Sequence, residues 1–287
     1  MDISGFGGDG TLAACDIGAR LVGAAAIFTF VRTRNDIVLA AGIQSVQLLA
    51  ASIPAWILLF RKHQIRWSFP SRGVLWEQVV SGWHVFISTA AINVYTTSNT
   101  FVLGLICGQT AVGFFSAANK IVQAVLGLLT PISQAIYPHL SHLAAQSRQT
   151  ALRLIRKVLH IFAPAGLLAS LVLFIGAEPI VHLVLGQQYA QSVPVLRIFA
   201  ALPFLLALSN VFGIQTMLTF GLNRLFSRIL LASAALDLLL IFPLAHLDCA
   251  TGAAFAILGT EIFVTFAMGW SLYRKGFAIL FSRQEIL

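Results

Sequence analysis

The chain alternates between long apolar runs and short polar segments along its 287 residues. A helix needs about 20 consecutive, mostly apolar residues to cross the hydrocarbon core of a bilayer. Runs of this kind predict eight transmembrane spans, at 15–33, 37–60, 82–106, 111–137, 158–177, 198–220, 228–246 and 250–273. The pattern therefore predicts an all-α integral membrane protein with about eight transmembrane helices.

The composition excludes a soluble globular domain. The chain is 58% hydrophobic and 10% charged, with a mean hydropathy of +0.88. A soluble domain carries about 25% charged residues. The net charge of +8 would suggest a nucleic-acid partner in a soluble protein, but here Lys and Arg flank hydrophobic spans. We therefore expect membrane lipid and no nucleic acid as a partner.

The basic residues concentrate in alternate polar segments, and this predicts the orientation of the chain. They are Arg61, Lys62, Arg66 and Arg72; Arg148, Arg153, Arg156 and Lys157; Arg224 and Arg228; and Arg274, Lys275 and Arg283. The other loops hold only Arg32, Arg34 and Arg197. Because basic loops stay on the cytoplasmic side, both termini are expected in the cytoplasm.

The same segments suggest a domain organisation. We expect two spans in 1–60, a cytoplasmic basic linker at 61–80, a six-helix bundle at 81–275 and a cytoplasmic tail at 276–287. The outer segment 178–197 predicts a short interfacial helix followed by a turn at Pro194.

No motif for metal, cofactor or covalent chemistry stands out. The cysteines Cys15, Cys107 and Cys249 are isolated, without a CxxC pair, so neither a metal site nor a disulfide framework is suggested. The histidines are scattered, and no phosphate-binding glycine loop occurs. We therefore expect a protein that is not an enzyme and that binds no cofactor or metal.

A polar stripe runs along the span at 111–137. Its members are Lys120, Gln123, Gly127, Thr130 and Gln134. Their spacings of three and four residues place them within a wedge of roughly 80° on a helix. A lysine near the middle of a span costs about 2.5–3.5 kcal/mol, so it normally faces a partner or a water-filled cavity. Lys120 is the leading candidate for a functional residue.

The preceding span carries a similar stripe. It consists of Thr89, Asn93, Thr96 and Thr100, with Asn99 beside it. Small polar side chains also hold membrane helices together through hydrogen bonds worth about 0.6 kcal/mol each. For these residues a structural role and a role in a substrate pathway both stay open.

Other ionisable residues fall inside the predicted spans. Arg20 follows Asp16 by one helical turn, so the two could pair. Asp237 and Glu261 lie near the middle of the last two spans. Either carboxylate could carry a proton or pair with a cation, or could form an interhelical hydrogen bond.

The stretch from Tyr95 to Ala144 resembles the Wzx-type flippases of lipid-linked oligosaccharides. The resemblance rests on "TSNTFVLG", "VGFFSAANKIVQA" and "PISQAIYPHLS", and the later "GAAFAILGTEIFV" resembles the last helix of that family. These polysaccharide biosynthesis proteins belong to the multidrug/oligosaccharidyl-lipid/polysaccharide exporter superfamily. The resemblance covers residues 17–275.

The resemblance implies a twelve-helix exporter with two six-helix bundles around a central cavity. The eight spans would be equivalent to its last eight, with Arg20 on the fifth helix. Such proteins move undecaprenyl-diphosphate-linked O-antigen units across the bacterial inner membrane by alternating access. The resemblance also implies antiport of H⁺ or Na⁺ and a polysaccharide polymerase as a protein partner. Lys120 would then meet the diphosphate, with Asn99 and Gln123 nearby.

Three other functions remain open. A drug or cation antiporter of the same superfamily is one, although a cavity lysine disfavours a cationic substrate. A truncated, inactive transporter is the second, because a single bundle cannot rock against a missing one. A membrane-embedded polymerase is the third, and the short outer loops disfavour it.

Overall fold

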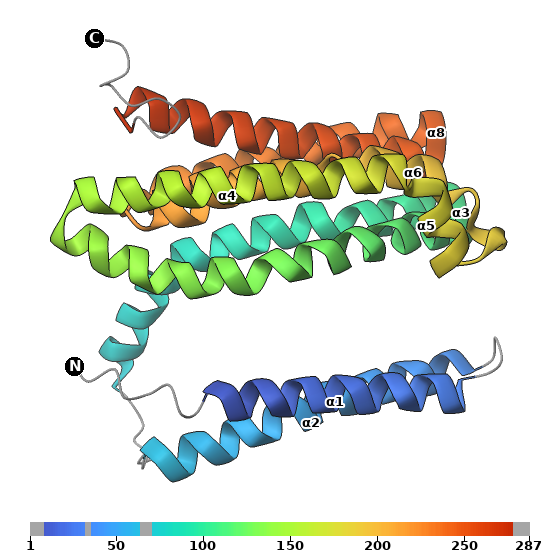
Figure 1. Cartoon of the computed structure of the whole chain (residues 1–287), viewed down its shortest axis with the longest axis horizontal. Coiled ribbons are helices and arrows are strands. Elements are labelled where there is room, and N and C mark those ends of the chain that lie inside the picture. The colour runs from blue at the N-terminus through green and yellow to red at the C-terminus, as the bar shows by residue number, and fades with distance from the viewer. Residues whose placement is uncertain (1–8, 32–35, 64–70, 278–287) are drawn as a thin grey trace. The chain divides into compact units, whose positions relative to one another are not determined.

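The computed structural model describes residues 9–31, 36–63 and 71–277 (Figure 1). Every regular element in these ranges is helical. The chain divides into two compact units, 1–72 and 73–287. Residues 64–70 of the predicted linker at 61–80, and the predicted tail beyond 277, lie outside the described residues. The predicted all-α membrane fold is confirmed.

The first unit is a helical hairpin. Helix α1 (Asp9–Phe30) packs along α2 (Ile37–His63). The buried Gly23 lets the helices approach closely, because a Cβ there would collide with the side chain of Gln47. Large apolar side chains on both helices are exposed, as expected of helices that face lipid or other membrane helices.

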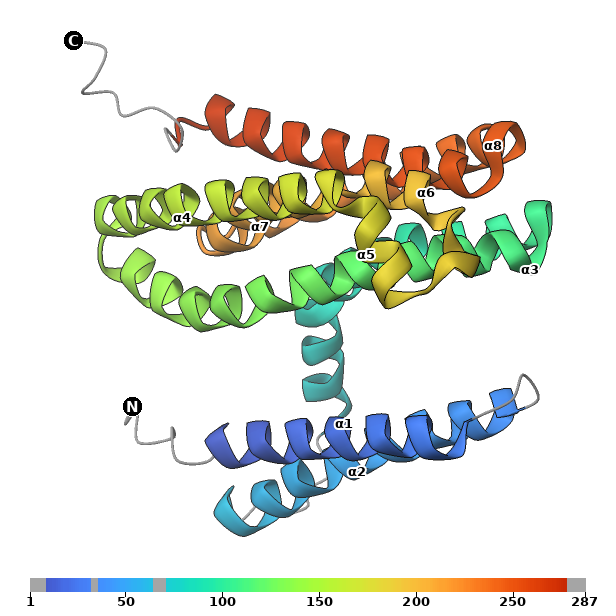
Figure 2. The ribbon, with the colours of Figure 1, turned by 45° about the vertical axis from the view of Figure 1, so that its right-hand side comes forward.

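The second unit is built from long helices and a short helical segment between them. Its elements are α3 (Arg72–Gln146), α4 (Arg148–Ile175), α5 (Ala177–Val184), the 3₁₀ turn η2 (Gln187–Tyr189), α6 (Ser192–Phe199), α7 (Leu202–Phe212), the π-helical turn η3 (Gly213–Leu218) and α8 (Asn223–Arg274). Figure 2 shows α4, α7 and α8 running side by side.

Helices α3 and α8 are each two arms joined at a break. Gly108 has a φ of 79°, which favours glycine, and it interrupts α3. Asp248 and Cys249 interrupt α8 with non-helical backbone angles. The two arms of α3 fold back on each other at this break, and Gly104 of the first arm therefore lies beside Val112 of the second. The described part of this unit, 73–277, therefore contains six long helical stretches.

By length and composition, four helices in the described part of the chain could cross a membrane: Thr97–Leu128, Arg148–Ile175, Ser192–Leu218 and Asn223–Arg274. The first and last of these ranges each include one of the breaks. Shorter apolar helices lie at Leu21–Phe30 and Val38–Gln47.

Two predictions about loops are wrong. Segment 138–157 is helical except at Ser147, whose side chain caps α4 by accepting from the backbone N–H of Thr150. Pro194 lies in the first turn of α6 and not in the turn that follows α5. Proline has no backbone N–H, and the first turn of a helix tolerates this because its N–H groups have no partner within the helix. Hydropathy marks the apolar stretch, and a helix can continue into the interface beyond it.

The helices meet in two apolar clusters. One contains Leu140, Ile155, Val211, Phe226 and Met268, and the other contains Leu103, Phe115, Leu196, Ile241 and Ala253. Gly166 permits the close contact of α4 with α7, since a Cβ would lie 2.9 Å from the Pro203 carbonyl oxygen. This packing determines which side chains remain on the outside of the unit.

Candidate functional site

The polar stripe of α3 points away from the core of its unit. Its members are exposed: Lys120, Gln123, Gly127, Thr130 and Gln134. Ala118 and Val122, on the other side of the same helix, are fully buried. A membrane helix normally exposes apolar side chains to lipid, so this face is unsuited to acyl chains. We call these five residues the polar face.

Lys120 is the charged residue of the polar face. No carboxylate within the described ranges forms an ion pair with it. The exposed Thr130 hydroxyl donates to the backbone carbonyl of Leu126 at 3.0 Å, so its oxygen can still accept a hydrogen bond. The amides of Gln123 and Gln134 add donors and acceptors. The face can therefore contact an anion and several hydroxyl groups.

The structure does not bring together the candidate residues that were predicted on the preceding span. Asn93 is exposed, and the side chain of Thr96 lies outside the described residues. Asn99 is fully buried and turns into the core, away from the exposed face of the helix. The side chain of Arg20 also lies outside the described residues. The structure thus groups Lys120, Gln123, Thr130 and Gln134, and it places Asn99 elsewhere.

Asn99 belongs to a buried polar cluster with Asp237. Its amide nitrogen donates to Asp237 Oδ2 at 2.8 Å. The hydroxyl of Thr260 lies 3.2 Å from Asp237 Oδ1 and 2.9 Å from the carbonyl oxygen of Ala256. A hydroxyl has one proton, so Thr260 can donate to one of these at a time. The cluster connects the first arm of α3 to both arms of α8.

Glu261 follows Thr260 on the second arm of α8. It is 4% exposed. Asp237 and Glu261 each lie about three to four helical turns from the break at Asp248, so they share a similar depth. No group of three or more His, Cys, Asp and Glu side chains suited to a metal occurs in the part of the chain that the structure describes.

A second buried polar cluster was not predicted. Ser133 donates to the side-chain oxygen of Asn210 at 2.7 Å, and Gln215 donates to both Ser133 oxygens at 2.9 Å. Gln215 lies in the π-helical turn η3, an irregularity that is frequent at functional sites. The sequence signal was a lone glutamine in an apolar run, which alone does not identify a partner.

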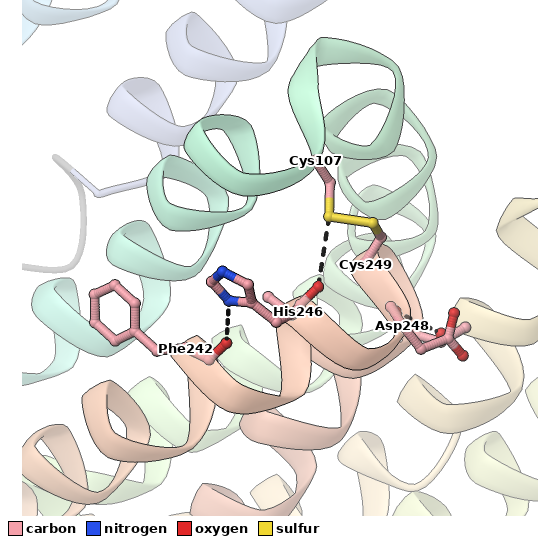
Figure 3. The surroundings of a disulfide bond; sticks show 7 residues. Cys107, Phe242, His246, Asp248 and Cys249 are labelled. Atoms are coloured by element: carbon pink, nitrogen blue, oxygen red, sulfur yellow. Dashed lines mark hydrogen bonds between the residues drawn. A yellow bond between two sulfur atoms is a disulfide. The ribbon is translucent and has the colours of Figure 1, made fainter.

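A disulfide joins the two breaks, contrary to the expectation from the sequence. Cys107 precedes Gly108 at the break of α3, and Cys249 lies in the break of α8 (Figure 3). Their Cα atoms are 5.8 Å apart, although 142 residues separate them in the sequence. We call this end of the unit, with residues 176–201, the disulfide end.

The opposite end of the unit is strongly basic. It carries Arg148, Arg153, Arg156, Lys157, Arg224, Arg228, Arg274 and Lys275, near the ends of α4 and α8. We call it the basic end. At the disulfide end, Glu178 and Arg197 form an exposed ion pair at 3.5 Å. The charges are therefore separated along the helix axes, as in proteins whose basic loops face the cytoplasm.

Comparison with known proteins identifies the family. A family model described as "Polysaccharide biosynthesis protein" matches residues 12–144. A protein of Escherichia coli (strain K12) named "Putative O-antigen transporter" is 44% identical over 241 residues, which are 84% of this chain and 58% of that protein. The chain belongs to the polysaccharide biosynthesis protein family.

A second family member supports the assignment. A Shigella dysenteriae protein of the same name is 31% identical over 252 residues, 87% of this chain and 62% of that protein. The chain thus spans about three fifths of the length of these curated relatives. No solved structure matches the chain. The resemblance seen in the sequence is confirmed, and the chain is a multi-pass membrane member of this family.

The family match covers the whole polar face of this polysaccharide biosynthesis protein, but not the buried carboxylates of α8. It includes 12–144 and so contains Lys120 and Gln134, but not Asp237 or Glu261. The longer alignments cover more than four fifths of the chain. The arrangement offers one exposed cation with neutral hydrogen-bonding groups, which suits binding and release of a ligand.

Proposed function

We infer that the chain serves in a transporter that moves a lipid-linked O-antigen unit across the bacterial inner membrane. The observation that carries this proposal is the exposure of Lys120 on the polar face of an otherwise apolar membrane helix. The names of both relatives, which describe O-antigen transporters, support the substrate class. Both termini of the chain are cytoplasmic in this proposal, with the basic end on the same side.

The polar face forms one wall of a hydrated passage. Lys120 attracts the diphosphate that links an undecaprenyl lipid to the sugars, because an ammonium group supplies three donors to phosphate oxygens. Gln123, Thr130 and Gln134 exchange hydrogen bonds with sugar hydroxyls along about four helical turns. A second helical bundle forms the opposite wall, and rocking of the two gives alternating access.

A coupled ion is a further part of this proposal. Asp237 and Glu261 are the buried carboxylates of α8, and Asp237 already contacts two other helical stretches. A proton or Na⁺ that binds Asp237 would compete with the donors from Asn99 and Thr260. Such competition can change how α3 packs on α8, which links ion binding to bundle movement.

Replacement of Lys120 tests the substrate role. In an Escherichia coli strain that lacks its own O-antigen transporter, we expect Lys120→Ala in the full-length protein to reduce surface O-antigen by about tenfold or more, the cost of one charge-assisted contact. Lys120→Arg should retain most display, because the positive charge remains. Protein in the membrane is measured by immunoblot.

Lys157→Ala is the matched control. Lys157 is an exposed lysine of the same unit on α4, outside the polar face. Its replacement should leave O-antigen display unchanged. Wild-type display by Lys120→Ala at normal protein level would overturn the assignment of Lys120 to the passage. A cationic-drug resistance phenotype without O-antigen display would favour the antiporter instead.

A further inference from the structure

An open, shallow pocket at the basic end is lined by three cations. Its volume is about 460 Å³, within the range of pockets that hold small ligands. The lining residues are Gly221, Leu222, Asn223, Arg224, Leu225, Arg228 and Lys275. No carboxylate is among them. Since neighbouring cations repel one another, a pocket of this kind is stabilised by an anion that binds between them.

The start of α8 adds backbone donors to the pocket. Leu222 is the N-cap and offers no side-chain hydrogen bond to the first turn. The first N–H groups of a helix have no partner within the helix, and the helix dipole favours negative charge there. Asn223, Arg224 and Leu225 form this first turn and line the pocket. The backbone therefore favours the same ligand as the side chains, an oxyanion such as phosphate.

Lys275 is held beside this turn by the packing of the residues that follow it. Gly276 adopts a positive φ of 74°, and the N–H of Phe277 bonds to the carbonyl of Leu272 at 3.0 Å, which is a Schellman motif. Phe277 is buried against Phe220, with ring centroids 5.0 Å apart. Lys275 is thus fixed near the pocket and is not on a free tail.

Arg148 also contributes to this anchoring. Its guanidinium lies 4.3 Å from the centroid of the Phe277 ring. This contact connects the start of α4 to the segment that follows α8, two residues beyond Lys275. The positive charge is therefore preorganised by packing, which lowers the cost of binding an anion.

Exposed aromatic residues place the pocket at the depth of lipid headgroups. Trp270 is 53% exposed and Tyr273 is 72% exposed, and their ring centroids are 6.1 Å apart. Trp and Tyr are enriched where a membrane helix leaves the hydrocarbon core. Tyr273 precedes Lys275 by two residues, so the pocket opens at the membrane–water interface.

We propose that this pocket binds the phosphate headgroup of an anionic phospholipid. Basic pockets between membrane helices hold such headgroups. Arg224, Arg228 and Lys275 contact the phosphate oxygens together with the N–H groups of the first turn of α8. Leu222 and Leu225 contact the glycerol and the first methylene groups. The bound lipid links the two arms of α8 at the basic end, where no disulfide joins them.

Native mass spectrometry of the purified full-length protein tests this proposal. Phosphatidylglycerol and phosphatidylcholine are titrated separately, and bound lipid is counted. We expect one phosphatidylglycerol site whose affinity exceeds that for phosphatidylcholine by about tenfold, because only the former carries net negative charge. Each cation near a membrane surface raises the affinity for an anionic lipid about fivefold. The affinity of the triple variant R224Q/R228Q/K275Q for phosphatidylglycerol should therefore fall about a hundredfold.

The triple variant R153Q/R156Q/K157Q is the matched control, because it removes the same charge from the same end on α4. It should bind phosphatidylglycerol like the wild type. If the pocket variant fails to fold, Arg228→Gln alone should weaken binding about fivefold. Equal losses in both triple variants, or wild-type binding by the pocket variants, would overturn the proposal.

Inorganic phosphate separates a lipid ligand from a soluble one. We expect millimolar phosphate to leave the bound phosphatidylglycerol in place, since the glycerol and acyl contacts are absent from the free ion. Displacement by micromolar phosphate would assign the pocket to a soluble anion and would overturn the lipid assignment. Neither result depends on the roles proposed for Lys120 and the polar face.

Discussion

The side-chain amide of Asn99 donates a 2.8 Å hydrogen bond to the carboxylate of Asp237, and both residues are fully buried. The two are 138 residues apart in the sequence. A buried carboxylate without donors is strongly destabilising, so this bond and the contact with Thr260 offset the cost of placing Asp237 in the core. The cluster therefore determines how α3 and α8 pack.

Removal of either partner should destabilise the unit. We expect Asn99→Ala to lower the free energy of unfolding by about 1–3 kcal/mol, because it leaves the Asp237 oxygen unsatisfied. Asp237→Ala should have a similar cost. The double variant should lose less unfolding free energy than the sum of the two single losses, as expected for residues in contact. Thermal unfolding of the purified protein in detergent measures these effects.

Asp248→Ala serves as the control for these variants. Asp248 is exposed at the break of α8, where a substitution should change stability by no more than about 0.5 kcal/mol. Strict additivity of the Asn99 and Asp237 variants would contradict an energetic contact between them.

Asp237→Asn separates ion coupling from structural support. Asparagine has the shape of aspartate and still accepts hydrogen bonds, but it cannot bind and release a proton. If Asp237 carries the coupled ion, this variant should fold normally and lose about tenfold or more of O-antigen display. Glu261→Gln is examined in parallel. Normal display by both variants would exclude these two carboxylates from ion coupling.

Much of the second unit could be predicted from hydropathy alone. The six apolar runs from 82 to 273 correspond to its six long helical stretches, because a run of about 20 apolar residues has no stable alternative in a membrane. The stripe from Lys120 to Gln134 was also predicted as one face, since the helical period fixes it. Its exposure on the unit is an additional finding.

Contacts between distant segments could not be predicted in this way. Asn99 belonged to a polar stretch of its own span, and only tertiary packing shows that it faces Asp237. The disulfide was missed because Cys107 and Cys249 have no spacing motif, and 142 residues separate them. Helical periodicity reports the face of one helix and carries no information on which helix packs there.

The disulfide predicts which end of the unit is outside the cytoplasm. Disulfides form in the bacterial periplasm and are rare in the cytosol. The Cys107–Cys249 pair lies at the end opposite the basic residues, which agrees with basic loops in the cytoplasm. We expect protein from wild-type membranes to resist maleimide labelling at both cysteines until it is reduced. A strain without its periplasmic thiol oxidase should yield labelled protein.

Loss of the disulfide should also reduce stability. Cys107→Ser with Cys249→Ser should lower the free energy of unfolding by about 2–4 kcal/mol, since the bond closes a long loop. Cys15→Ser is the control, as Cys15 lies outside this pair. Free thiols at both positions in wild-type cells would contradict the bond and remove its support for the orientation.

Gly252 should be sensitive to the addition of a single methyl group. A Cβ at this buried residue would collide with the backbone carbonyl of Leu244, across the break that joins the two arms of α8. Backbone atoms cannot move aside as a flexible side chain can, so we expect Gly252→Ala to cost about 1–3 kcal/mol or more in unfolding free energy. It should also lower the yield of the Cys107–Cys249 disulfide, because the break is displaced.

Gly113→Ala is the matched control, since Gly113 is an exposed helical glycine with open space around its Cα. That variant should be neutral or stabilising by up to about 1 kcal/mol, because alanine favours the helix. Equal stability of the two variants, measured by thermal unfolding in the same detergent, would show that the arms of α8 do not approach as closely as the structure places them.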